Sequence, residues 1–240
     1  MSLRQGRRLP TVALIGADGA GKTTVGRRLG EVLPMPVKYL YMGVNAGASN
    51  HLLPTTRVIR AIKRVTGAAP DTAGPPDPLG ARLVKPRGGL GRRATRSGRA
   101  LLRLLNRLAE EWYRQIIAWR HLRRGELVVF DRHYFSDYLA YDIEGGPGLP
   151  LSRRVHGFLL AHAYPRPDLV IFLDAPAEVL LARKGEGTLE SLERRRADYL
   201  AVAEHCRQFA VVDADRPLDQ VVHDVAELVR GAAHVPAPGR

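Results

Sequence analysis

The sequence predicts an α/β fold, a three-layer sandwich in which helices cover both faces of a mostly parallel five-stranded sheet. Short apolar runs alternate with segments of helical spacing along the 240-residue chain, which is the order of β-α-β units. The composition, 45% hydrophobic and 25% charged, is that of a globular protein large enough for one sizeable core. No linker divides the chain, so we expect a single domain over residues 1–230.

Five apolar runs are the expected strands. Four of them are strongly apolar, as strands buried on both faces usually are, and the second along the chain is weaker. The runs are residues 11–16, 37–42, 126–131, 168–174 and 209–213.

Segments with apolar residues at every third or fourth position are the expected helices. They span residues 23–33, 100–122, 176–184, 189–205 and 218–229. The longest places seven apolar side chains on one face, and we interpret its two tryptophans as core residues. The seven are Leu101, Leu104, Leu105, Leu108, Trp112, Ile116 and Trp119.

Two segments lack such spacing. Residues 67–98 hold five prolines among many Gly and Arg residues, and a loop of this length in a compact domain is usually functional or mobile. We therefore expect a variable basic insert over residues 43–99. The final segment, residues 231–240, has two prolines and no periodicity, and we expect a flexible tail there.

The charge is unevenly distributed along the chain. The formal net charge is +13, and residues 82–124 contribute +11 of it, because thirteen Lys or Arg residues there are opposed only by Glu110 and Glu111. Such a stretch indicates an anionic partner, which could be a phosphorylated small molecule, a nucleic acid or an acidic membrane surface. An Arg-rich solvated surface would give the same count, so charge alone leaves these alternatives open.

Several classes of protein are disfavoured. No apolar run approaches the ~20 residues that a membrane-spanning helix needs, and the apolar run near the N-terminus is too short for a signal peptide. The single Cys206 cannot form an internal disulfide, which fits a reducing compartment. The eight histidines show no paired spacing typical of a zinc site. We therefore expect a cytoplasmic protein without a membrane span.

Residues 16–23, GADGAGKT, match the phosphate-loop pattern G-x-x-x-x-G-K-[ST] between an expected strand and an expected helix. Glycines let backbone N–H groups surround phosphate oxygens, and the helix N-terminus adds partial positive charge. Lys22 would reach the β- and γ-phosphates, and the Thr23 hydroxyl would ligate Mg²⁺. We therefore predict that ATP and Mg²⁺ bind here, with the nucleotide held by Gly16, Gly19, Ala20, Gly21, Lys22, Thr23 and Thr24.

A second candidate element is the end of the third expected strand, where Arg132 follows Asp131. Ligands bind beyond the carboxyl ends of parallel strands, so Asp131 would hold Mg²⁺ together with Thr23, directly or through water. Arg132 would bind a phosphate. Asp174 also ends a strand, but a helix follows it directly, and we interpret Asp174 as a helix cap.

Four segments in this order resemble the thymidylate kinase family of P-loop nucleoside monophosphate kinases. They are GADGAGKTT at 16–24, FDRHYFSDYLAYD at 130–142, FLDAPAEVLLARKGEG at 172–187 and the closing pattern RRRADYL…FAVVDADRPLDQVVHDV. The likeness covers about residues 1–36 and 100–230. It implies a P-loop NTPase-type fold with a short lid, and an ATP-dependent phosphotransferase activity.

The resemblance also implies roles for single residues. Asp18 matches the acidic loop residue that faces the acceptor nucleotide, and Arg132 is similar to the arginine that holds the acceptor phosphate. Arg183 and Lys184 fall where the family's lid begins, and lid cations would neutralise the charge on the transferred phosphoryl group. The catalytic residues would be Lys22, Asp18, Asp131, Arg132 and Arg183.

The acceptor half departs from the family pattern. His133 stands where the family usually has Tyr, and the sequence after the second strand reads YMGVNAG at 41–47, without the family's Glu-Pro-Gly stretch. Our leading hypothesis is a kinase that phosphorylates a small anionic acceptor, first a thymidylate-like nucleoside monophosphate, and that could form a homodimer. One alternative is a kinase of a sugar or specialised metabolite. Another is a nucleotide-binding protein whose basic arm binds nucleic acid or another polyanion.

Overall fold

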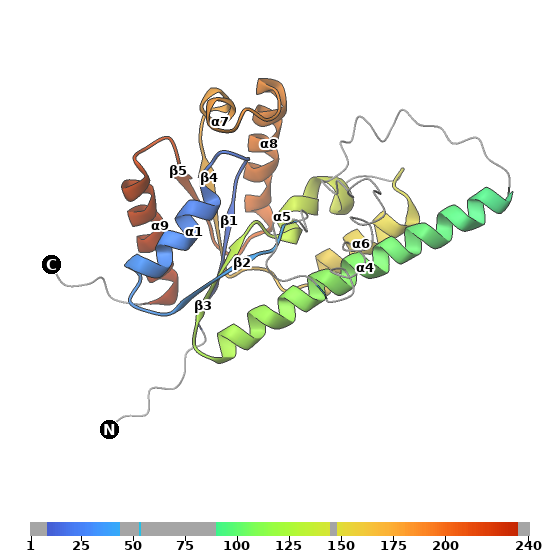
Figure 1. Cartoon of the computed structure of the whole chain (residues 1–240), viewed down its shortest axis with the longest axis horizontal. Coiled ribbons are helices and arrows are strands. Elements are labelled where there is room, and N and C mark those ends of the chain that lie inside the picture. The colour runs from blue at the N-terminus through green and yellow to red at the C-terminus, as the bar shows by residue number, and fades with distance from the viewer. Residues whose placement is uncertain (1–8, 44–52, 54–89, 145–147, 235–240) are drawn as a thin grey trace, which may run out of the picture.

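The computed structural model describes residues 9–43, 53, 90–144 and 148–234. Its sheet has five strands, all parallel, in the order β2-β3-β1-β4-β5 (Figure 1). The strands are β1 (Thr11–Ile15), β2 (Val37–Tyr41), β3 (Leu127–Asp131), β4 (Leu169–Asp174) and β5 (Phe209–Asp213). All five predicted strands are confirmed.

Side chains alternate along each strand and build a core on each face of the sheet. In β1, Val12 and Leu14 belong to one core, and Ala13 and Ile15 belong to the other. The first core is covered by α1 (Lys22–Val32), α7 (Ala177–Lys184) and α9 (Leu218–Ala233). The second is covered by α4 (Leu90–Arg123), α5 (Tyr134–Tyr138), α6 (Leu151–His162) and the end of α8 (Leu189–Ala201). The predicted three-layer sandwich is therefore confirmed (Figure 1).

Residues 134–162 contain helical elements that the sequence did not predict. They are α5, the π-helix η2 (Leu139–Ile143) and α6, while a 3₁₀ turn, η3 (Val202–His205), follows α8. The first two are too short to show a helical period, and α6 exposes Phe158 while it buries His156. No helix in the described part of the chain combines the length and apolar character that crossing a membrane requires.

Two predicted irregular segments are partly helical. Helix α4 begins at Leu90, so the loop predicted for residues 67–98 is wrong from Leu90 onward. Residues 90–123 contain no proline, and the many Arg, Leu and Ala residues among them favour helix. Most of the expected basic insert, up to residue 89, lies outside the described residues. The tail predicted over residues 231–240 is wrong at its start, because α9 continues to Ala233, and residues 235–240 lie outside the described part.

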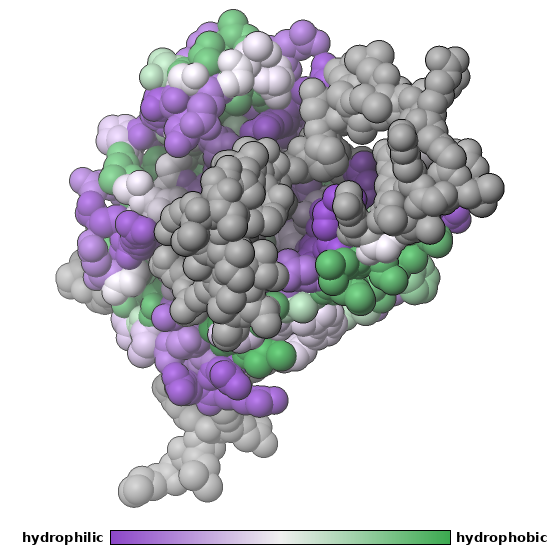
Figure 2. Space-filling model, turned by 45° about the vertical axis from the view of Figure 1, so that its right-hand side comes forward, coloured by the Kyte–Doolittle hydropathy of each residue, from purple (hydrophilic) through white to green (hydrophobic). Residues whose placement is uncertain are grey.

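The apolar stripe of α4 is buried only in part. Leu104 is buried, and Leu108 and Trp112 pack against the second core, but other leucines of the stripe are exposed. Leu101 and Leu105 are 55% and 53% exposed, whereas Glu110, Glu111 and Arg114 are buried. Figure 2 shows the apolar residues gathered on the surface along α4. The core prediction is therefore wrong for the exposed leucines of this stripe. The inward face of α4 also carries charged residues. They are stable there because Arg114 binds the carbonyl oxygen of Gly43 and Glu111 binds His156.

Candidate active site

The phosphate loop connects β1 to α1 and depends on its glycines. Gly16 has a φ of 145°, and a Cβ there would lie 2.6 Å from the carbonyl oxygen of Leu173. Gly21 is the N-cap residue of α1, with a φ of 83°, and no side chain caps the helix. The first N–H groups of α1 are therefore free of side-chain caps, and these are the donors that bind phosphate in such loops.

Lys22 lies within this loop and is buried. Its Nζ donates a 2.7 Å hydrogen bond to the carbonyl oxygen of Ala17, which directs the ammonium group across the loop. Burial lowers the pKa of Lys22 to about 8, with a further lowering by Arg132, while nearby carboxylates, first Asp18, oppose the shift. The lysine is thus a poorly hydrated cation that an anion would stabilise strongly.

Asp131, at the end of β3, faces the first turn of α1. Its Oδ2 accepts a 2.6 Å hydrogen bond from Thr23 Oγ1 and a second from the hydroxyl of Tyr39 on β2. Its Oδ1 is buried and has no hydrogen-bond partner among the residues that the structure describes. A buried carboxylate oxygen without a donor, beside a threonine hydroxyl, suits a hard cation such as Mg²⁺, which prefers oxygen ligands. The predicted pair of metal ligands therefore lies together.

Arg132 turns back toward the phosphate loop. Its φ of 62° is in the left-handed region, which is rare for a residue other than glycine. The guanidinium forms an ion pair with Asp18, and a second arginine, Arg195 of α8, lies 3.4 Å from the other oxygen of the same carboxylate. Burial alone would raise the pKa of Asp18, but Arg132, Lys22 and Arg195 together lower it. Asp18 thus holds two arginines beside the loop.

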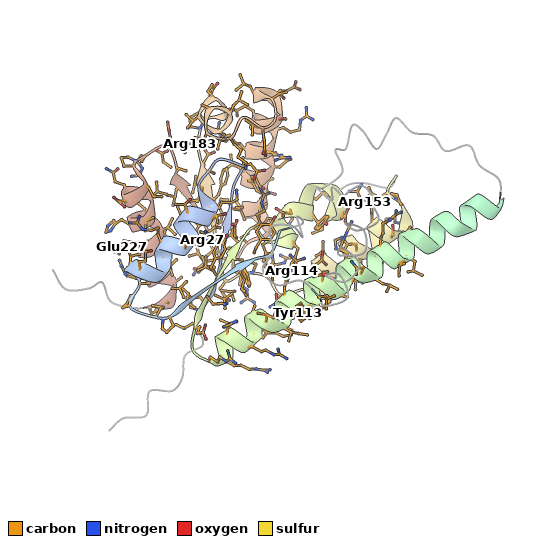
Figure 3. The ribbon with its side chains drawn as sticks, viewed as in Figure 1. Arg27, Tyr113, Arg114, Arg153, Arg183 and Glu227 are labelled. Atoms are coloured by element: carbon orange, nitrogen blue, oxygen red, sulfur yellow. The ribbon has the colours of Figure 1, made fainter. Side chains whose placement is uncertain are left out.

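Arg183 and Lys184 lie in the last turn of α7, and both form ion pairs with residues outside the phosphate loop. Arg183 donates a 2.9 Å hydrogen bond to the carbonyl oxygen of Ala214 and lies 3.4 Å from Asp215, so it faces the turn after β5 (Figure 3). Lys184 pairs with Glu186 at 3.6 Å. The catalytic role predicted for Arg183 remains a prediction.

The role predicted for Asp174 was wrong. Helix α7 begins after Pro176, which is its N-cap residue, and no side chain caps it. The carboxylate of Asp174 instead accepts hydrogen bonds from Nε and Nη2 of Arg196 on α8, at 2.7 Å and 2.9 Å. Arg196 is thereby fixed to the end of β4, while its neighbour Arg195 reaches the phosphate loop.

The polar face of α4 supports the same end of the sheet. Arg114 donates a 2.9 Å hydrogen bond to the carbonyl oxygen of Gly43, just after β2, and Gly43 is packed against Arg132 so closely that a Cβ would lie 2.6 Å from its Cδ. Gln115 accepts a 2.8 Å hydrogen bond from the hydroxyl of Tyr134. Figure 3 shows Arg114 between α4 and the sheet. These contacts hold the backbone around Arg132.

A buried network of charged side chains joins α4, η2 and α6. His156 of α6 lies between Asp142 of η2, at 2.6 Å, and Glu111 of α4, at 3.2 Å, and Arg153 binds the other oxygen of Asp142 at 2.6 Å.

A second buried histidine, His133, lies next to Arg132. Burial lowers its pKa to about 3, so it stays neutral, and its Nδ1 accepts a hydrogen bond from the backbone N–H of Phe135.

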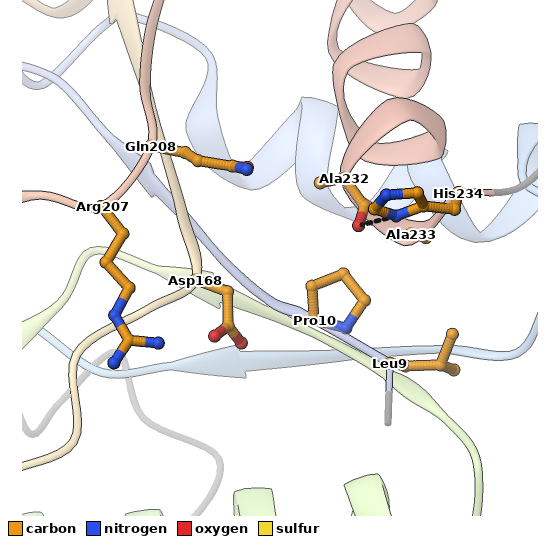
Figure 4. Close-up of a pocket in the computed structure, with 8 residues that line it drawn as sticks. All are labelled: Leu9, Pro10, Asp168, Arg207, Gln208, Ala232, Ala233 and His234. Atoms are coloured by element: carbon orange, nitrogen blue, oxygen red, sulfur yellow. Dashed lines mark hydrogen bonds between the residues drawn. The ribbon is translucent and has the colours of Figure 1, made fainter. Parts of the chain in front are cut away.

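A cavity of ≈ 300 Å³ lies elsewhere, at the opposite end of the sheet. It is lined by Leu9, Pro10, Asp168, Arg207, Gln208, Ala232, Ala233 and His234 (Figure 4). Pro10 precedes β1 and Asp168 precedes β4, so these are the amino ends of the strands. Ligands of parallel sheets bind beyond the carboxyl ends, and the phosphate loop is there. The cavity is therefore not our candidate site.

Comparison with known proteins gives consistent results. Residues 92–225 match the family model described as thymidylate kinase. The chain is 33% identical over 247 residues to a protein named thymidylate kinase from Xanthomonas campestris pv. campestris (strain B100), covering 94% of this chain and 89% of that protein. It is 31% identical to the thymidylate kinase of Xanthomonas oryzae pv. oryzae (strain PXO99A), covering 92% and 83% of the two chains. A probable thymidylate kinase from Archaeoglobus fulgidus is 34% identical over 115 residues.

Proposed function

Because the chain belongs to the thymidylate kinase family, we propose that it transfers the γ-phosphoryl group of ATP, in a Mg²⁺-dependent reaction, to a small acceptor. The first candidate is a nucleoside monophosphate of the thymidylate type. The observation that carries this proposal is Asp131. It accepts the hydroxyl proton of Thr23 and is followed directly by Arg132, so the phosphate loop, a carboxylate and an arginine meet at one end of the sheet.

The donor half is built to bind the triphosphate. The glycines of the loop bring backbone N–H groups to the phosphate oxygens, and the buried ammonium of Lys22 adds a full charge with little surrounding water. Thr23 and Asp131 would hold Mg²⁺, which when bound would neutralise charge on the phosphate oxygens. Thr23 Oγ1 donates a hydrogen bond to Asp131 Oδ2, and a hydroxyl oxygen that donates its proton can still offer a lone pair to a cation.

The acceptor half supplies positive charge on the other side of the loop. Arg132 lies beside Asp18 and has a planar, bidentate donor group that suits a phosphate. Arg195 approaches the same carboxylate from α8. Phosphoryl transfer needs mainly positioning and stabilisation of the charge on the equatorial oxygens. Lys22 on one side of the loop, with Arg132 and Arg195 on the other, would supply this stabilising charge.

The proposal is tested by an acceptor screen. ADP release is measured with ATP, Mg²⁺ and either nucleoside monophosphates or unphosphorylated sugars and nucleosides. We expect release that depends on a nucleoside monophosphate. Turnover only with a hydroxyl acceptor would replace the nucleotide by a sugar or metabolite. Salt-sensitive nucleic-acid binding without acceptor turnover would contradict the kinase altogether.

We also propose that a second copy of the chain covers the exposed apolar face of α4 and α6, which pack against each other. Large exposed apolar patches on folded proteins usually mark interaction sites. The face comprises Leu101, Leu102, Leu105, Leu151, Val155 and Phe158. Light scattering should give a dimer mass for the wild type and a monomer mass for Leu105→Asp. The control Leu218→Asp, at an exposed leucine of α9, should stay dimeric, and a monomeric wild type would contradict this proposal.

A further inference from the structure

Tyr39 contacts the metal-binding carboxylate, although no sequence motif includes it. It lies on β2 opposite Val129 of β3, two residues before the end of that strand. From this position its hydroxyl donates a hydrogen bond to Oδ2 of Asp131. The same oxygen accepts the hydroxyl of Thr23 at 2.6 Å. Two donors from two different elements therefore converge on one oxygen of Asp131.

Helix α1 leaves room for this tyrosine through a glycine. A Cβ on Gly26 would lie 2.8 Å from two carbons of the Tyr39 ring, a distance that real Cβ atoms do not adopt. The ring therefore packs directly on the helix that follows the phosphate loop. Gly26 is one turn beyond Lys22, so the packing that places the tyrosine hydroxyl also fixes β2 against the start of α1.

The two hydrogen bonds give the two carboxylate oxygens of Asp131 different surroundings. Oδ2 accepts hydrogen bonds from the hydroxyls of Thr23 and Tyr39, while Oδ1 is buried without a partner in the described part of the chain. A carboxylate held through one oxygen cannot rotate freely, so the other oxygen keeps a fixed direction.

We propose that Tyr39 is a positioning residue that orients Asp131 for Mg²⁺. This inference rests on the proposed function, because it assigns the metal to Thr23 and Asp131. Groups that hold a metal ligand by hydrogen bonds fix its direction, and losing one typically costs about 10-fold to 100-fold in metal affinity or activity. Tyr39 should therefore set the affinity for the metal, and the affinity for the acceptor should not depend on it.

The test compares Tyr39→Phe with Gly26→Ala. The first removes the hydroxyl and keeps the ring, and the second keeps the hydroxyl and displaces the ring. Binding of Mn²⁺ to the protein–ADP complex, followed by the electron paramagnetic resonance of free Mn²⁺, gives a readout without turnover. We expect both variants to weaken Mn²⁺ binding by about 10-fold and to raise the Mg²⁺ concentration for half-maximal rate similarly, with the KM for acceptor unchanged. Tyr113→Phe, at a tyrosine of α4 outside the site, is the matched control.

The outcomes separate this inference from the proposed function. Wild-type Mn²⁺ affinity in a folded Tyr39→Phe variant would overturn the role of Tyr39, even if the kinase itself is active. A lower kcat with unchanged metal affinity would also overturn it, because that pattern indicates a structural role. If Tyr39→Phe does not fold, Gly26→Ala decides between the same results. A wild type without Mg²⁺-dependent ADP release would instead contradict the proposed function.

Discussion

The hydroxyl of Thr23 and the carboxylate of Asp131, 108 residues apart in the chain, form a hydrogen bond of 2.6 Å. The bond joins the first turn of α1 to the end of β3. It exists because β1 and β3 are adjacent and parallel, with Leu14 opposite Asp131, so that both carboxyl ends face the phosphate loop. The site is thus a direct consequence of the strand order.

Replacing Lys22 should remove activity and leave the fold intact. Lys22→Ala loses a preorganised cation that is buried beside the phosphates, and such losses lower turnover by about 10²-fold or more. Steady-state ADP release, with circular dichroism for folding, measures this. Arg28→Ala, which removes an arginine on the surface of α1 paired with Glu31 and Asp219, should keep near wild-type turnover. Equal rates for the two variants would exclude the proposed role of Lys22.

Arg132 and Asp131 are neighbours with different expected effects. Arg132→Ala should raise the KM for phosphorylated acceptors by about 10-fold or more, because it removes a bidentate phosphate donor. Asp131→Asn should lower turnover with every acceptor and weaken the Mg²⁺ dependence. Acceptor kinetics measure both effects. Unchanged kinetics in Arg132→Ala would mean that the acceptor carries no phosphate at this position, and a hydroxyl acceptor would then be the better account.

Arg195 should contribute to the chemical step. It lies 3.4 Å from Asp18, whereas Arg194, one residue earlier, pairs with the exposed Glu190 at 3.0 Å. We expect Arg195→Ala to lower kcat by about 10-fold or more, since arginines that neutralise transferred phosphoryl groups have at least this effect. Arg194→Ala should change kcat little. Similar kinetics for both variants would show that Arg195 does not act in the chemical step.

The His156 network should make stability depend on pH. Burial alone would lower the pKa of His156, but its hydrogen bonds to Asp142 and Glu111 raise it above the ordinary 6.5. A group with a raised pKa stabilises the fold fully below its ordinary pKa and loses that contribution as pH rises through the raised value. The Tm deficit of His156→Gln should therefore be largest below pH 6.5 and shrink as the pH rises through the raised pKa.

The pKa of Asp142 sets the acidic limit of the pH range in which the contribution of His156 can be measured. Burial would raise its pKa, yet His156 and Arg153 lower it below 3.8, so its contribution is present above that value and is lost only as pH falls through the lowered pKa. Thermal unfolding from about pH 5 upward thus isolates the histidine. His162→Gln, on the exposed side of α6, is the control. A Tm deficit that is constant across this range would show that His156 is buried in its neutral form.

The phosphate loop and Asp131 could be predicted from the sequence because each is marked by a pattern of neighbouring residues. The phosphate loop is a contiguous run whose glycines and lysine have fixed places, and Asp131 ends a strand that is recognisable from its apolar residues. Arg195 and Tyr39 were missed because their contacts are tertiary. One depends on where α8 approaches the loop, and the other depends on β2 lying beside β3. The run of three arginines at 194–196 was the only local signal for Arg195.

Helix α4 shows the limit of periodicity as a guide to burial. Its leucines and isoleucine define an apolar stripe, yet Leu101 and Leu105 face outward and Glu111 and Arg114 face inward. The inward charges are stable because His156 and the Gly43 carbonyl are their partners. Those partners come from distant segments, so no pattern within α4 indicates them.

The proposed kinase activity is tested most directly by following the phosphoryl group itself. The protein is incubated with ATP labelled at the γ-phosphate, Mg²⁺ and a nucleoside monophosphate, and the labelled products are separated. We expect the label to move to the corresponding nucleoside diphosphate with the wild type, and we expect Lys22→Ala to form almost none. Label found only in inorganic phosphate, or left on ATP with every acceptor tested, would contradict the assignment of a nucleoside monophosphate kinase.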